Sequence, residues 1–125
     1  MITHPKTEEL VEAVARWIDG IRPALDPRQA YLARVAANVL GVVQRELTQG
    51  PAAEAGAITR MSKLLGHGGT YGELNAELCN LLANGEMGVA TPGLIAALKA
   101  NALDQIAIDQ PNYQSADLRG PSPGA

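Results

Sequence analysis

Residues 26–47 read DPRQAYLARVAANVLGVVQREL, and apolar side chains recur along them with the three- and four-residue spacing of an α-helix. Asp26 is a capping residue type, and Pro27 suits the first helical position, where a missing backbone N–H costs little. Nothing interrupts the pattern before Leu47. About twenty residues make a helix of about 30 Å, the width of a small domain. We therefore expect a long central helix here.

Helical patterns also precede and follow this segment. We expect four more helices, over Pro5–Ile18, Pro51–Leu65, residues 71–84 and residues 92–108. Gly50-Pro51 is predicted to close the long helix and open the next one, while Thr70 caps the following helix and Gly85 ends it. The sequence thus predicts an all-α domain over residues 1–113, a compact bundle of about five helices joined by short connections.

The amino-acid composition agrees with helices. The chain has no Phe, one Trp and three Tyr, so the core must consist mostly of Leu, Val, Ile and Ala, and Ala and Leu are the strongest helix formers. Residues 114–125, QSADLRGPSPGA, have too little apolar surface to offset the entropy of ordering. We expect a disordered tail there.

The charges argue against several classes of partner. The net charge is −3, and the ten Lys and Arg form no run, so we expect neither nucleic acid nor an anionic membrane as partner. If the helices over Pro51–Leu65 and residues 71–84 formed a helix-turn-helix, the second of them would read DNA. That helix, however, carries Glu73 and Glu77 and no Lys or Arg. No apolar segment approaches the ~20 residues that span a bilayer, and residues 1–6 are not a signal peptide. We expect a cytoplasmic protein.

Residues that could hold a metal or act as nucleophiles are few. The only histidines are His4 and His67, and neither stands three residues after a Glu as a di-iron bundle site needs. Cys79, the only cysteine, lies mid-helix between leucines, where a buried and inert thiol is expected. His67 stands in a glycine-rich turn that reads as a flexible helix connection. We expect no metal, no cofactor and no catalytic residue.

The long helix carries an unusual polar stripe. Arg34, Asn38 and Arg45 share one narrow side of the helix, Gly41 leaves a gap between them, and Glu46 lies beside Arg45. Two guanidiniums and an amide in a row suit a carboxylate or phosphate, because Arg presents a planar fork of donors. The alternative is structural, namely that these groups pair with Glu73 or Glu77 of a neighbouring helix.

A second polar group stands in the segment LNAEL at residues 74–78. Its polar members are Asn75 and Glu77. Glu73 and Glu77 are four residues apart and share a helix face, and paired carboxylates can bind metal or transfer protons. Asn75 and Glu77 therefore join the candidate ligand or interface residues.

Four segments resemble the signature of a bacterial family of unknown function. They are YLARVAANVL at residues 31–40, VQREL at 43–47, LNAEL at 74–78 and DQPNY at 109–113. The members of that family are short helical proteins, many of them encoded beside aminoglycoside-phosphotransferase-like kinases and acyl-CoA dehydrogenases. The resemblance covers residues 5–113 and implies an accessory role in which Arg34, Asn38, Arg45, Glu46, Asn75 and Glu77 take part.

Three hypotheses about function follow. The first is a non-enzymatic accessory protein that binds a partner, a phosphotransferase-like kinase or an acyl-CoA dehydrogenase according to the resemblance. The second is a binder of a small anionic molecule, such as an acyl-CoA, through Arg34 and Arg45. The third is a free-standing enzyme of unknown type. A homodimer is a further expectation, because a small bundle rich in Ala and Leu can leave an apolar helix face uncovered.

Overall fold

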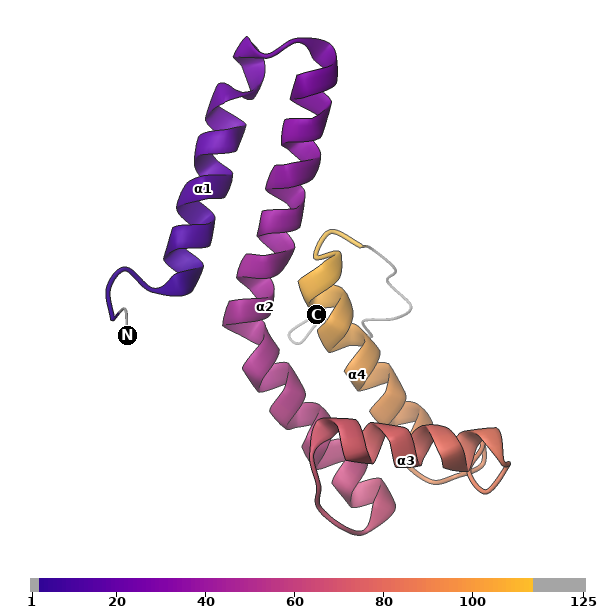
Figure 1. Cartoon of the computed structure of the whole chain (residues 1–125). Coiled ribbons are helices and arrows are strands. Elements are labelled where there is room, and N and C mark those ends of the chain that lie inside the picture. Colours follow the sequence, from indigo (N-terminus) through magenta and orange to yellow (C-terminus); the bar gives the residue numbers. More distant parts are fainter. Residues whose placement is uncertain (1–2, 114–125) are drawn as a thin grey trace, which may run out of the picture. The chain divides into compact units, whose positions relative to one another are not determined.

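The chain folds into helices joined by short loops. A computed structural model describes residues 3–113. Its elements are α1 (Thr7–Ile21), the 3-10 turn η1 (Arg22–Ala24), α2 (Pro27–Leu65), α3 (Tyr71–Ala83) and α4 (Leu94–Asp109), shown in Figure 1. The predicted all-α class is confirmed, since these residues contain no strand, but they form four α-helices instead of about five. The predicted disordered tail lies outside the described residues.

The difference in helix number arises at Gly50-Pro51. The prediction that this pair ends one helix and starts another is wrong, because α2 continues through Pro51 for 39 residues in all. Proline inside a helix removes one backbone hydrogen bond and crowds the preceding turn, at a cost of about 3 kcal/mol. Ala57 and Met61, farther along the same helix, belong to a buried core.

The predicted helix ends are confirmed at three places. The Asp26 carboxylate accepts the backbone N–H of Gln29 at 2.9 Å, and the Thr70 hydroxyl accepts that of Glu73 at 3.2 Å. Side chains at these positions satisfy backbone N–H groups that have no partner within the first turn. Gly85, just beyond α3, has φ of +81°, a conformation that favours glycine and ends the helix.

The last helix begins later than predicted. The helix predicted over residues 92–108 starts at Leu94, and Gly93, with φ of +80°, is the residue before its first turn. The Thr91 hydroxyl accepts the N–H of Gly88 at 3.0 Å, so it closes the preceding loop and does not cap α4. At the other end of the chain, α1 runs from Thr7 to Ile21 and so extends three residues beyond the predicted Ile18.

The helices belong to two compact units. The first ends at Pro51 and contains α1, η1 and the N-terminal part of α2; the second begins at Ala52 and contains the rest of α2, α3 and α4. The core of the second unit is formed by Ala57, Met61, Leu74, Leu78 and Leu94. None of the described helices is both long enough and apolar enough to cross a lipid bilayer.

Candidate functional site

In the first unit, α1 and the N-terminal part of α2 form a helical hairpin with η1 at its turn (Figure 1). Large apolar side chains are exposed along both of its helices. We call these residues the hairpin stripes: Leu10, Val14 and Trp17 on α1, and Tyr31, Leu32, Val35, Val39, Val43 and Leu47 on α2. Their exposed fractions run from 40% at Val43 and Leu47 to 67% at Tyr31, and Trp17 is 64% exposed. Side chains of this size usually lose most of their surface in a folded protein.

The spacing of the apolar residues explains why so many stay exposed. Leu10, Val14 and Trp17 follow one another at four and three residues and therefore share one side of α1. Val11 and Ile18 lie on another side of the helix and are half-buried, and no residue of α1 is fully buried. α1 thus carries more apolar surface than the first unit covers.

The polar stripe predicted from the sequence, with Arg34, Asn38 and Arg45, lies on α2 within the first unit. Arg34, Asn38 and Glu46 are exposed, and Arg45 is half-buried. A Cβ atom added at Gly41 would lie 3.1 Å from Nη1 of Arg45. The gap that Gly41 leaves on the helix is therefore occupied by the side chain of Arg45, which turns back over the preceding turn as helical side chains do.

The structure groups Arg34 with a different arginine. Arg34 lines an open depression of about 610 Å³ at the turn between α1 and α2, together with Arg22 and Tyr31. Arg22 pairs there with Asp19, at 3.4 Å between Nη1 and Oδ1. Arg34 and Arg45 stand eleven residues apart, which is about 16 Å along a helix. The two arginines are therefore about three turns apart on α2.

Asn75 and Glu77 lie on α3 in the second unit. Asn75 is exposed, and Glu77 binds His67, with 2.8 Å between Glu77 Oε2 and His67 Nε2. Nδ1 of the same ring lies 3.0 Å from the carbonyl oxygen of Gly68. Both ring nitrogens thus face acceptors, so the doubly protonated imidazolium satisfies both contacts. The turn around His67, expected to be a plain flexible connection, is tied to α3.

These contacts favour the protonated form of His67. The hydrogen bond to the backbone of Gly68 raises the pKa of the His67 imidazole above 6.5, and the hydrogen bond and charge of Glu77 raise it further. His67 and Glu77 are ten residues apart on a loop and the helix that follows it. That short separation is the one sequence signal that could have indicated the pair.

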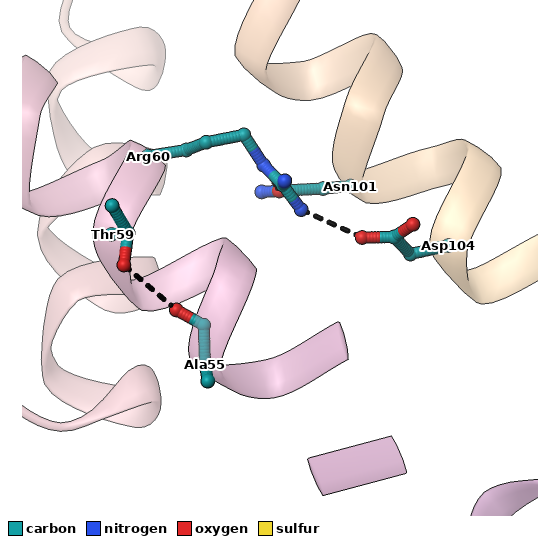
Figure 2. A network of polar contacts seen from close by, with 5 residues as sticks. All are labelled: Ala55, Thr59, Arg60, Asn101 and Asp104. Atoms are coloured by element: carbon teal, nitrogen blue, oxygen red, sulfur yellow. Dashed lines mark hydrogen bonds and ion pairs between the residues drawn. The ribbon is translucent and has the colours of Figure 1, made fainter. Parts of the chain in front are cut away.

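A polar network around Arg60 is not among the sites predicted from the sequence. Nε of Arg60 donates to Asn101 Oδ1 at 2.7 Å, and Nη2 donates to Asp104 Oδ2 at 2.8 Å. Figure 2 shows the Arg60 side chain reaching from α2 to these two residues of α4. Nη1 of Arg60 would lie 3.2 Å from a Cβ at Gly56. Glycine four residues before arginine, as at Gly41 and Arg45, is the signal that could have indicated this site.

The remaining reactive groups are dispersed. Cys79 is exposed on α3, so the expectation of a buried thiol is wrong. The helix turns its buried side, with Leu74 and Leu78, toward the core, and Cys79 lies away from it. Within residues 3–113, no three side chains of His, Cys, Asp or Glu are grouped so that they could hold a metal ion.

Comparison with known sequences places most of the chain in one family. Residues 23–113 match the model of a family described as a domain of unknown function, DUF6285. No curated protein and no solved structure matches the chain. The matched region contains α2, α3 and α4, and therefore all six of the candidate residues predicted from the sequence.

Proposed function

We propose that this chain, which belongs to the DUF6285 family of unknown function, is an accessory protein that binds another protein chain through the hairpin stripes. The observation that supports this function is the exposure of nine large apolar side chains on two adjacent helices. Exposed apolar surface of this extent marks interaction sites in soluble proteins. Binding of this kind requires only that apolar surface be buried and needs no catalytic group.

The first unit has little to hold it together without a partner. Ala37, at 9% exposed, is the one described apolar side chain in it that is buried, and Ala has little surface to bury. A helix of 15 residues such as α1 is marginal in water unless its apolar side is packed. Covering the hairpin stripes therefore supplies stability that the unit lacks by itself.

The occupant that we propose is a second copy of the same chain. Two hairpins that pair their stripes form four packed helices, an arrangement in which each copy covers the same residues of the other. An interface of ordinary size buries about 800 Å² on each partner. Nine large side chains that are 40–67% exposed, with two aromatic rings among them, are sufficient for such an area.

Light scattering during size-exclusion chromatography tests this proposal. We expect the full chain at tens of micromolar to have a mass of about 26 kDa, twice the 13.1 kDa of one copy. Val39→Glu places a carboxylate within the stripes, and we expect it to weaken dimerisation roughly 100-fold or more, because the charge would be buried without a partner. Emission of Trp17, the only tryptophan, should shift to longer wavelength in this variant as the ring returns to water.

Val89→Glu is the matched control. Val89 is 87% exposed on the loop before α4, outside the stripes, so the same substitution there should leave the dimer intact. A monomeric wild-type chain, or equal dissociation of the two variants, would contradict the proposal.

The family resemblance adds a second expected partner. A phosphotransferase-like kinase or an acyl-CoA dehydrogenase is expected in the native complex if the accessory role concerns such an enzyme. Tagged wild-type chain and Val39→Glu, purified from the native host and compared by mass spectrometry, test this point. An enzyme recovered with wild type and lost with Val39→Glu binds through the stripes or through the dimer that they form.

A further inference from the structure

The second unit contains a hollow between α2 and the start of α4. We call it the α2–α4 pocket; its lining includes Arg60, Lys63 and Leu64 of α2, and Pro92, Ala96 and Ala97 at or near the start of α4. Its volume is about 550 Å³. Small-molecule sites in proteins usually measure about 300–1,000 Å³, so this pocket has room for a compact ligand.

Most of the pocket wall is apolar. Leu64 provides one side, and a Cβ atom added at Gly93 would lie 3.7 Å from its Cδ2, so the two helices meet in ordinary contact at the edge of the hollow. Pro92 and Ala96 add exposed apolar atoms, and Ala97, at 7% exposed, forms the deeper part. Such a wall binds the hydrocarbon part of a molecule by removing it from water.

Two cations stand at the same wall. Arg60 is held in place by Asn101 and Asp104, and the Asp104 carboxylate balances its charge. Lys63, one turn further along α2, is exposed and forms no ion pair with any residue between 3 and 113. The pocket therefore carries one uncompensated positive charge beside a guanidinium of fixed orientation, and this suits a single anionic group.

The loop before α4 adds a neutral donor. The Thr91 hydroxyl oxygen, which also lines the pocket, already accepts the N–H of Gly88 and keeps its own hydrogen to donate. The first turn of α4 contributes a partial positive charge to the same wall, in addition to the two cations.

We propose that the α2–α4 pocket binds a small anionic amphiphile, a molecule with an apolar body and one carboxylate or phosphate group. The apolar body contacts Leu64, Pro92 and Ala96, and the oxyanion binds Lys63 with the pre-positioned Arg60. This site lies outside the hairpin stripes and involves none of the six residues predicted from the sequence. It is independent of the proposed dimer, and either can fail without the other.

Titration of the full chain with octanoate, followed by amide NMR shifts, tests the proposal. We expect saturable shifts at Gly93, Ala96 and Ala97, and binding of the neutral octanamide at least fivefold weaker. Octyl phosphate distinguishes the two oxyanions, since the one that binds more tightly identifies the preferred group. Octanamide binding as tightly as octanoate, inorganic phosphate binding as tightly as octyl phosphate, or no shift at the pocket amides would overturn the proposal.

Three variants locate the ligand. Lys63→Gln should raise the Kd for octanoate about five- to tenfold, through loss of a charged hydrogen bond at an exposed site. Lys99→Gln makes the same charge change on an exposed position of α4 outside the pocket, and should change the Kd less than twofold. Ala96→Leu fills the pocket from an exposed helical position that tolerates leucine, and should weaken binding at least tenfold. Equal effects of the two lysine variants, or unchanged binding to Ala96→Leu, would count against this site.

Discussion

At the scale of single residues, the structure assigns partners that differ from those suggested by helical spacing. Helical spacing suggests Glu77 as a partner for the arginines of α2, yet its carboxylate binds the His67 ring on the loop that precedes α3. Arg45 lies over Gly41, and Arg60 lies over Gly56. A glycine four residues before an arginine thus gives the guanidinium space to lie along the helix, and at Arg60 the other guanidinium nitrogens reach α4.

The His67–Glu77 pair predicts a dependence of stability on pH. Because the folded-state pKa of His67 is raised, its contribution is fully present below the unfolded value of about 6.5 and is lost as pH rises through the folded value. We expect the difference in free energy of unfolding between wild type and Glu77→Gln to decrease over this range in urea titrations. NMR titration of the His67 ring should show its pKa lowered in Glu77→Gln, though only in part, since the Gly68 contact remains. A difference independent of pH would show that the imidazolium plays no part.

At the scale of elements, α2 is the unusual feature of the fold. It runs for 39 residues and contains Gly50-Pro51, a pair that normally marks the end of one helix and the start of another. The boundary between the two compact units falls at this pair, so the sequence signal corresponds to a division of the molecule even though the helix continues. Helix termination and unit boundary are separate properties, and proline here indicates the second.

Replacement of Pro51 by Ala should stabilise the chain. The variant restores the backbone hydrogen bond and removes the clash of the ring with the preceding turn, so we expect the free energy of unfolding to rise by about 1–3 kcal/mol in urea denaturation followed by circular dichroism. Pro27→Ala is the matched control, because Pro27 is the first residue of α2, where no helical hydrogen bond is missing. It should change stability by less than about 1 kcal/mol. Destabilisation by Pro51→Ala would indicate that the helix depends on a distortion at this point.

At the scale of the whole molecule, the two units bury apolar surface to very different extents. The second has a core of fully covered side chains, among them Met61, Leu74 and Leu94 at 0–1% exposed. The first leaves nine of its large apolar residues exposed in the hairpin stripes. Stability is therefore expected to differ between the units, with the second folding on its own contacts and the first gaining from association.

Two leucines of α3 test the core of the second unit. Leu78 is 2% exposed and Leu82, one turn later, is 37% exposed. Leu78→Ala should lower the free energy of unfolding by about 2–4 kcal/mol, because it removes buried methyl groups and leaves a cavity. Leu82→Ala should cost less than about 1 kcal/mol in the same denaturation experiment. Similar losses for both would mean that Leu82 is covered in solution, as an additional interface would require.

The sequence by itself determined the features that depend on neighbouring residues. The helical class, the caps at Asp26 and Thr70 and the glycine that ends α3 at Gly85 all arise from contacts within a few residues, so local pattern was sufficient to predict them. The position of Arg34, Asn38 and Arg45 on one stripe of α2 also follows from helical periodicity.

The tertiary structure alone decided what depends on distant residues. Arg60 meets Asn101 and Asp104 across 41 and 44 positions of the chain, and no local pattern encodes that contact. The continuation of α2 through Pro51 runs against the local signal of the Gly50-Pro51 pair and is seen only in the structure. The spacing of apolar residues shows which side of a helix seeks burial, but not whether the chain itself covers that side. For Leu78 it does, and for Val39 it does not, because the first unit has too few helices to enclose both faces of each.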